Sequence, residues 1–312
     1  MHHLIAYLLS PALIGLAALL LAIVWMLRDE SDRTRPLLVI ALVVNLFYGF
    51  LLQFVMGREN GLVPWKYDLV LTRLDEALGV RASAIAPILQ DARLPLLVVY
   101  QLMIPMMITW FAVARRYRVS AGLVVAYVTE MLVGPLLYAL LPACGPLYAF
   151  RGQWLHPLAV EAVPIRLSGM PNAFPSLHLA TALVFVFYSG GRASRAWSLA
   201  FLAGTLMATI ATGEHYVIDL VAGLAFGCFA ASVGRRRTAA SLLWLGVVLT
   251  WSVSVRWASG FLIRNPEVLR LLAGITVAGA LAAVIVAWRT GPAPVPSQAV
   301  QTAAESAEGA EV

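Results

Sequence analysis

Long apolar runs, separated by short polar segments, most constrain what this chain can fold into. Hydrophobic residues make up 61% of the chain and charged residues only 12%, which is about half the charge of a soluble domain. Several runs reach the ~20 residues that an α-helix needs to cross a bilayer. Because unpaired backbone groups are costly in lipid, such runs must fold as helices or closed barrels. The sequence therefore predicts an all-α, polytopic transmembrane helix bundle.

About nine candidate spans can be counted along the chain. They cover residues 4–27, 37–56, 95–114, 121–142, 176–190, 197–213, 216–234, 240–259 and 268–288. The first run is too long for the core of a signal peptide, which has roughly 7–15 residues, and it lacks a basic start. We therefore expect it to be a retained span.

The segment between the second and third spans contains an amphipathic stretch, Asp68–Leu78. One helical face is predicted to carry Leu71, Leu74 and Leu78, and the charged residues Arg73, Asp75 and Glu76 are expected elsewhere around the helix. The pattern predicts either an interfacial helix on the outer leaflet or a loop helix packed on the bundle.

The placement of arginine predicts the orientation of the spans. Alternate loops hold short basic groups, namely Arg28, Arg33, Arg35, Arg115, Arg116, Arg118, Arg192, Arg195, Arg235, Arg236 and Arg237. These loops are expected to be cytoplasmic, which places the N-terminus outside. The net charge of +6 then reports topology, because scattered arginines do not form a nucleic-acid-binding patch. The composition suggests a GC-rich bacterial genome, so the bacterial inner membrane is the expected location.

Two histidines stand at the starts of apolar runs. His178 closes the segment 174–178 (FPSLH), and His215 follows Glu214 at the start of a later run. Since the intervening chain descends and returns, both imidazoles are predicted at one depth on the extracytoplasmic side. Asp219 follows His215 by four residues and shares its helix face. A carboxylate there can accept from one ring nitrogen, which leaves the other nitrogen as a directed nucleophile.

This constellation predicts phosphoryl transfer at a bilayer surface. One histidine would attack phosphorus, and the second would protonate the leaving oxygen and then activate the acceptor. Ser176 at a helix N-terminus, where free N–H groups favour an anion, is expected to help bind phosphate. Arg151 and Arg166 lie in the loop facing this site and are expected to complete the cradle, because a guanidinium fork matches phosphate oxygens.

Other interpretations of these residues stay open. A histidine at a helix end is most often an interfacial polar residue, although two at matched depth weaken that interpretation. A metal site at His178, Glu214, His215 and Asp219 has no HxxxH or HExxH spacing to support it, so we expect no metal and no cofactor. Glu130, within the fourth span, could pair with an arginine or line the substrate route.

Two segments resemble a known family. AFPSLH and HYVIDLVAG are similar to the second and third motifs of the PAP2 (type 2 phosphatidic acid phosphatase) superfamily. With YALLPACGP at 138–146, the chain more narrowly resembles the branch that contains inositol phosphorylceramide synthases and sphingomyelin synthases. The resemblance covers roughly 135–225. It implies a six-helix catalytic core, metal-independent chemistry and a phosphohistidine intermediate, with His215 as nucleophile, Asp219 as its orienting partner and His178 as acid and base.

The chain departs from the lipid phosphate phosphatases of this family at three places. Their first motif, Lys-x6-Arg-Pro, is approached only by Lys66-x6-Arg73 without the proline, far upstream, and this is treated as chance. Ala208 and Thr209 stand where the phosphatases carry Ser-Arg, and Leu177 stands where they carry glycine. The phosphatase cradle is therefore missing, which favours transfer over hydrolysis.

The resulting hypothesis is an integral membrane lipid phosphotransferase. It would move a phosphoinositol-like headgroup from a phospholipid donor to a lipid hydroxyl, an exchange that needs no nucleotide, and no GxxxxGK[ST] or GxGxxG sequence is present. The first alternative is a lipid or polyprenyl phosphate phosphatase, with water as the acceptor. The second is a non-catalytic lipid-binding or transport protein.

Three regions are predicted. Residues 1–94 hold N-terminal transmembrane helices and the extracytoplasmic amphipathic segment, residues 95–289 form the PAP2-type catalytic membrane domain with C-terminal spans, and the tail 290–312 is expected to be disordered. Cys144 and Cys228 are expected at different depths and lack CxxC spacing, so neither a disulfide nor a metal site is expected. The sequence indicates no oligomeric state.

Overall fold

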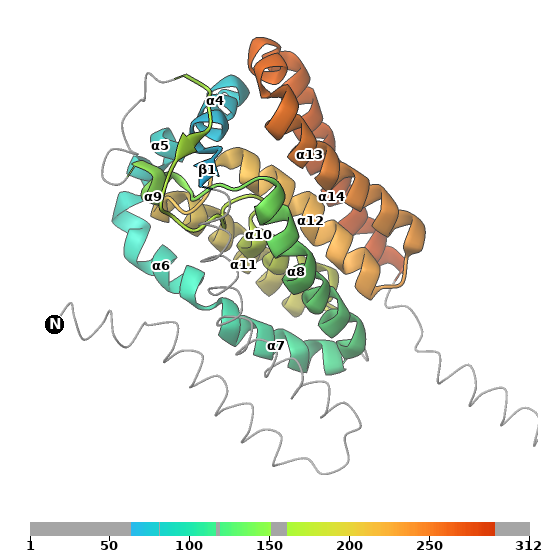
Figure 1. Cartoon of the computed structure of the whole chain (residues 1–312). Coiled ribbons are helices and arrows are strands. Elements are labelled where there is room, and N and C mark those ends of the chain that lie inside the picture. The colour runs from blue at the N-terminus through green and yellow to red at the C-terminus, as the bar shows by residue number, and fades with distance from the viewer. Residues whose placement is uncertain (1–63, 81, 117–118, 151–160, 291–312) are drawn as a thin grey trace, which may run out of the picture.

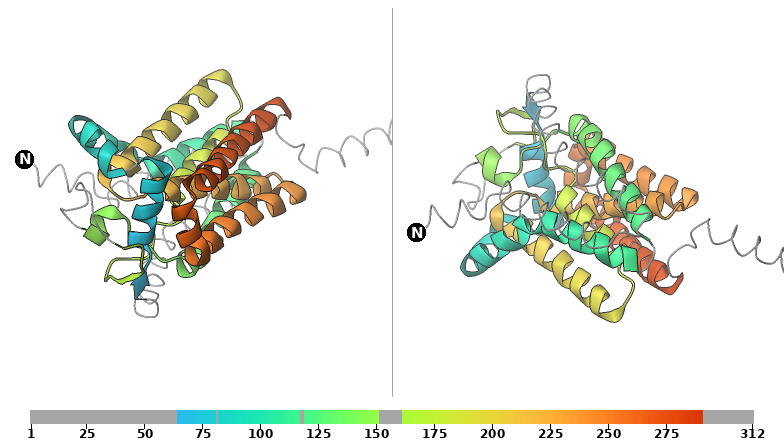
Figure 2. Two further views of the ribbon diagram at one scale, coloured as in Figure 1. Left: turned by 90° about the horizontal axis from the view of Figure 1, so that it is seen from above. Right: turned by 90° about the horizontal axis from the view of Figure 1, so that it is seen from below.

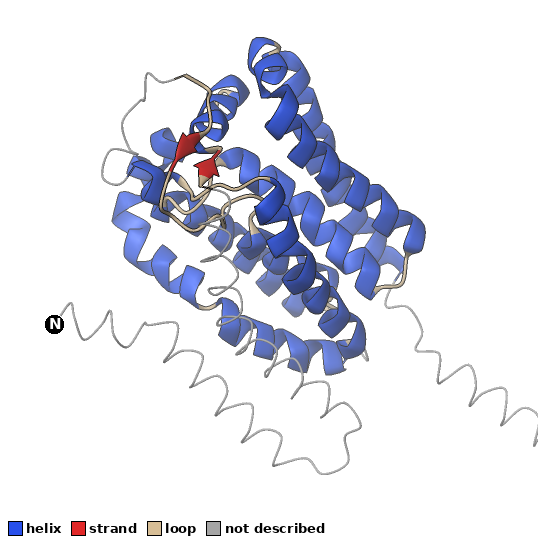
Figure 3. Cartoon of the chain, viewed as in Figure 1, coloured by secondary structure: helices blue, strands red, loops and turns tan. Residues whose placement is uncertain are grey.

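The computed structural model describes residues 64–80, 82–116, 119–150 and 161–290 (Figure 1). Within these residues the chain is almost wholly helical, as predicted, and the strands are limited to β1 (Trp65–Lys66) and β2 (Ile165–Arg166) (Figure 3). The two strands pair antiparallel, with Trp65 opposite Arg166. The predicted spans 4–27 and 37–56 and the tail beyond Thr290 lie outside the described residues.

The described helices run in chain order as follows: α4 (Asp68–Leu78), α5 (Ala82–Ile85), the 3-10 helix η1 (Ala86–Ala92), α6 (Arg93–Gln101), α7 (Met103–Arg116), α8 (Ser120–Leu140), α9 (Pro146–Phe150), α10 (Leu177–Phe187), α11 (Arg192–Thr212), α12 (Val217–Gly234), α13 (Thr238–Arg264) and α14 (Pro266–Thr290). Within this part of the chain, four helices are long and apolar enough to cross a membrane, namely α8, α12, α13 and α14. This agrees with a membrane protein, whereas the count of nine spans and the six-helix core stay predictions.

Two of the predicted spans differ from the helices observed. The span predicted at 95–114 is two helices, α6 and α7, which meet at Leu102. Leu102 leaves helical geometry (φ −75°, ψ 1°), and Pro105 follows in the first turn of α7, where its missing N–H costs no hydrogen bond. The span predicted at 176–190 is α10, whose 11 residues extend for roughly 16 Å, well short of the ~30 Å hydrocarbon core.

Helices α10 and α12 form the centre of the bundle. Every residue of α10 from Leu179 to Phe187 is buried, and nearly all of α12 is buried as well. Helices α8, α13 and α14 pack against α12, while α11 packs against α10 and α6 (Figures 1 and 2). Helices that are apolar on all sides belong in such an enclosed position. The two histidine motifs therefore begin the two most enclosed helices of this part of the chain.

Two glycines allow α10 and α12 to approach closely. A Cβ atom at Gly223 would lie 2.7 Å from the carbonyl oxygen of Ser176, and one at Gly227 would lie 2.7 Å from that of Ala180. This small-xxx-small spacing is a common means of close helix packing in membranes. It sets the N-terminal ends of the two helices beside each other.

Helix α4 packs on the bundle, which is the second of the two alternatives predicted for this segment. Its residues Leu71 and Leu74 are 0% exposed, and the helix lies against α12, α13 and α14. The prediction that Asp75 lies away from the apolar face was wrong, because Asp75 is buried with Leu71, four residues before it. Asp68, a full seven residues before Asp75, is buried on the same side.

Candidate active site

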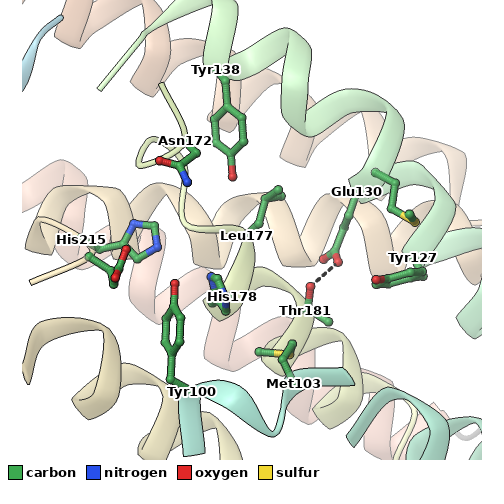
Figure 4. Close-up of a pocket in the computed structure, with 12 residues that line it drawn as sticks. Tyr100, Met103, Tyr127, Glu130, Tyr138, Asn172, Leu177, His178, Thr181 and His215 are labelled. Carbon is green, nitrogen blue, oxygen red and sulfur yellow. Dashed lines mark hydrogen bonds between the residues drawn. The ribbon is translucent and has the colours of Figure 1, made fainter. Parts of the chain in front are cut away.

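The structure brings His178 and His215 together, although they lie on different helical segments. His178 is in the first turn of α10, and His215 is in the short connection between α11 and α12. Their ring centroids are 6.2 Å apart, and the ring planes are inclined at 63°. The backbone N–H of Ser176 donates to the carbonyl oxygen of Asp219 at 3.1 Å, which ties the two motifs directly. Both imidazoles line a cavity of about 210 Å³ (Figure 4).

The hydrogen bonding of His215 defines which nitrogen can react. Its Nδ1 lies 2.8 Å from the carbonyl oxygen of Ala173. A carbonyl oxygen can only accept, so Nδ1 must carry the proton and Nε2 keeps its lone pair. Burial lowers the pKa of His215 to about 4, against smaller opposing effects of the Glu214 charge and the Ala173 hydrogen bond. The ring is therefore neutral at pH 7, with Nε2 available as a nucleophile.

Asp219 lies beside this imidazole but does not make the predicted orienting hydrogen bond. Its Oδ2 is 3.6 Å from Nδ1 of His215, which is too far for a hydrogen bond. The same oxygen accepts from the backbone N–H of Tyr216 at 2.9 Å, which caps the first turn of α12. Ala173 therefore orients the ring, while the Asp219 carboxylate is close enough to stabilise a positive charge that forms on it.

His178 is positioned by an aromatic stack. The ring of Tyr100, from α6, lies against it with 4.1 Å between ring centroids and 24° between planes. The hydroxyl groups of Tyr100 and Tyr138 and the amide of Asn172 also line the cavity, and Figure 4 shows them directed toward the space around the imidazoles. Neutral hydroxyl and amide donors of this kind can bind phosphate oxygens. None of the described residues that line the cavity is a lysine or an arginine.

The residues predicted to bind phosphate have other partners where they are described. Ser176 is fully buried as the N-cap of α10, where its Oγ accepts from the N–H of Leu179 at 3.4 Å. Arg166 is exposed on β2, with its guanidinium 5.9 Å from the centroid of the Trp65 ring. Arg151 lies outside the described residues. Their roles in phosphate binding stay predictions. Sequence reasoning missed Tyr100 and Asn172, which belong to no motif, and it gave no role to Tyr138, although Tyr138 begins the segment YALLPACGP.

Asp68 connects the loop that follows α8 to the segment that carries His215. Its carboxylate accepts from the backbone N–H groups of Cys144, at 3.1 Å, and Gly145, at 3.0 Å, and from the Tyr216 hydroxyl at 2.9 Å. Burial raises the pKa of Asp68 to about 6, and these donors oppose the rise because they favour the charged form. The connection that carries His215 is thus fixed to the loop after α8.

Asp75 caps the helix that follows His215. Its two carboxylate oxygens accept from the backbone N–H groups of Val217, at 2.8 Å, and Ile218, at 3.0 Å. These are orphan donors at the N-terminus of α12, where the helix dipole also favours an acidic partner. Sequence reasoning missed this function, although a signal was present: two acidic residues seven apart share the apolar face of α4.

Within the part of the chain that the structure describes, no three His, Cys, Asp or Glu side chains gather as a metal ion would require. Metal-independent chemistry stays a prediction. The cavity thus presents a directed imidazole nucleophile, a second imidazole across from it, and neutral hydrogen-bond donors around both. This arrangement is suited to nucleophilic and general acid–base catalysis.

Comparison with known protein families identifies the family to which the region around this site belongs. A family model described as the PAP2 superfamily matches residues 70–233, just over half of the chain. The matched region begins within α4, ends near the end of α12, and contains both histidine motifs. No curated protein and no solved structure matches the chain. The narrower branch suggested by the sequence stays a prediction.

Proposed function

This chain belongs to the PAP2 superfamily, and from that premise we propose that it transfers a phospho-headgroup from a phospholipid to a lipid hydroxyl. The headgroup suggested by the sequence resemblance is phosphoinositol-like. The observation that carries the proposal is the pair of facing imidazoles, with Nδ1 of His215 held by Ala173 so that Nε2 opens on the cavity.

The proposed reaction has two balanced steps. In the first, Nε2 of His215 attacks phosphorus, an N–P bond forms, and the P–O bond to the diacylglycerol breaks. His178 takes up a proton when the anionic donor lipid binds beside it, and it gives that proton to the departing oxygen. In the second, the acceptor hydroxyl attacks phosphorus and loses its proton to His178, while the N–P bond breaks and its electrons return to Nε2. Asp219 stabilises the positive charge on the His215 ring between the steps.

The charge of the cavity supports transfer of a phosphodiester over hydrolysis of a phosphomonoester. A monoester carries about −1.5 to −2 charges at pH 7, whereas a diester carries a single charge. The described lining supplies hydroxyl and amide donors but no lysine or arginine, and it contains the carboxylates of Glu130 and Glu214. Such a site suits the diester better, because fewer charges need to be balanced.

The location of the enzyme follows from the same proposal. The basic loops predict that the histidine end of α10 and α12 faces the extracytoplasmic side of a bacterial inner membrane. Both substrates are amphipathic, so they would enter the cavity from the bilayer. No metal and no cofactor are needed in the proposed steps.

A transfer assay tests this function. Purified protein in vesicles would be given headgroup-labelled phospholipid, with and without a lipid alcohol such as diacylglycerol or ceramide. We expect label to appear in a new phospholipid only when the alcohol is present, because the second step needs its hydroxyl. Label released as a free headgroup phosphate, independent of the alcohol, would identify hydrolysis of the phosphodiester in place of transfer. No turnover of any lipid would favour the non-catalytic alternative.

The pH dependence gives a separate check on the nucleophile. Because burial lowers the pKa of His215 to about 4, the ring loses its proton well below the usual 6.5. The value of kcat/KM reports the free enzyme. We expect it to stay constant down to about pH 5, where the His215 ring keeps its nucleophilic form, and to fall only near pH 4. An acidic limb with its midpoint near 6.5 would show that the ring is not desolvated as the structure describes.

A further inference from the structure

Glu130 is a buried carboxyl group that the proposed reaction steps do not use. It lies in the middle of α8 and is 2% exposed. Its Oε2 accepts from the hydroxyl of Thr181 at 2.7 Å, whereas Oε1 has no hydrogen-bond partner among the described residues. An unpaired acidic oxygen in an apolar span is costly, so it marks a site where a ligand group completes the hydrogen bonding.

The position of Glu130 relative to the histidines limits what that ligand group can be. Glu130 lines the same cavity as His178 and His215, and Figure 4 shows it on the far side of His178 from His215. Its partner Thr181 follows His178 by three residues on α10, which is a rise of about 4.5 Å along the helix. Glu130 is therefore offset along α10 from the histidines, where the hydroxyl that attacks phosphorus lies in the proposed reaction. The group at Glu130 must be a second donor on the same or another substrate.

The walls around Glu130 favour the body of a lipid over its phosphate. Met103 and Met131 flank this end of the cavity, together with Leu177 and the ring of Tyr127. Thr181 lies one turn further from the N-terminus of α10 than His178, so this end is the deeper one. The described lining offers no basic side chain that would hold a phosphate there.

Resting on the proposed function, we propose that Glu130 is a specificity site for the acceptor lipid. Its Oε1 accepts a hydrogen bond from a second O–H or N–H group, located a few bonds from the hydroxyl that attacks phosphorus. The acceptor class is therefore a lipid alcohol with two neighbouring donors, such as a vicinal diol. Thr181 holds the carboxylate in place through Oε2. Binding the second donor also turns the reacting hydroxyl toward His178 and favours the lipid over water.

A matched pair of acceptors tests this site. The lipids are 1-O-hexadecylglycerol, which is a vicinal diol, and its 2-deoxy analogue, which keeps only the reacting hydroxyl. We expect the wild type to prefer the diol by about tenfold in kcat/KM, since a buried acceptor that is left without its donor weakens binding by about that ratio. Glu130→Leu should bring the ratio close to one, and the isosteric Glu130→Gln should leave a smaller preference. Thr129→Val, the neighbouring change on the same helix, should leave the ratio unaltered.

The outcomes separate this site from the proposed function. Equal rates with the two acceptors in the wild type, or a preference that survives Glu130→Leu, would overturn the site while the transfer reaction stands. If neither lipid is an acceptor, the transfer function fails. The proposed site can then still be tested by measuring the Kd of the diol and of its 2-deoxy analogue for His215→Ala protein and comparing the two values. If Glu130→Gln changes only the preference among donor headgroups, with the acceptor ratio intact, Glu130 binds the donor headgroup and the acceptor proposal is wrong.

Discussion

Replacing His215 with Ala should lower kcat for headgroup transfer by about 10⁴-fold or more, because the group that bonds to phosphorus is lost. The imidazole is held by the carbonyl oxygen of Ala173, and the ring of His178, 6.2 Å away between centroids, is assigned the acid and base role. The loss should be seen in kcat at saturating donor, with the KM for the donor changed much less. Turnover that survives this substitution would rule out a phosphohistidine at this position.

A comparison of the two histidines separates their roles. His178→Ala removes the proton donor and should slow transfer by about 10²–10⁴-fold, yet it leaves the nucleophile intact. Protein incubated with donor lipid labelled at phosphorus and quenched in base should therefore retain label in the wild type and in His178→Ala, but not in His215→Ala. Label retained by His215→Ala and lost from His178→Ala would reverse the assignment of nucleophile and acid.

Replacing Asp75 with Ala should destabilise the folded protein by roughly 2–4 kcal/mol, because two backbone N–H groups at the start of α12 lose their partner. The effect should reach the active site, since Val217 is only two residues from His215. Unfolding of purified protein in detergent, followed by helical signal against denaturant, measures the change in free energy. Transfer activity below the unfolding transition measures how far the nucleophile is displaced.

Two neighbouring substitutions serve as controls for Asp75. Glu76→Ala removes a partly exposed pair with Arg73 and should change stability by less than about 0.5 kcal/mol. Asp75→Asn keeps one accepting oxygen, so its effect should lie between those of the other two. If Asp75→Ala proves as mild as Glu76→Ala, the carboxylate is not the cap that supports α12.

Much of the framework could be predicted because it depends on periodic patterns. The apolar runs predict helices wherever a backbone must satisfy its own hydrogen bonds in lipid, and they located α8, α12, α13 and α14. The errors fell where local backbone chemistry differs from hydropathy. One predicted span is interrupted at Leu102. Another, predicted at 176–190, is the shorter helix α10 of 11 residues, which is enclosed by other helices.

The candidate site was predictable only for residues that belong to motifs. His178 and His215 stand at the starts of runs that descend and return, so their proximity follows from helix order. The partners of His215 do not follow in this way. Asp219 has the right spacing for an orienting contact, yet the carbonyl oxygen of Ala173 takes that place, and Oδ2 of Asp219 accepts from the N–H of Tyr216.

By itself, then, the amino-acid sequence determined that this is a helical membrane protein, and it singled out the two imidazoles of the candidate site. It could do so because hydropathy and short spacings act locally along the chain. Only the tertiary structure decided which nitrogen of His215 is free, that Asp68 and Asp75 brace the connection carrying it, and that Glu130 opens on the same cavity. Those contacts join residues far apart in the sequence. They arise from helix packing, such as the close approach that Gly223 and Gly227 allow. A periodic sequence pattern does not show which helices pack against each other.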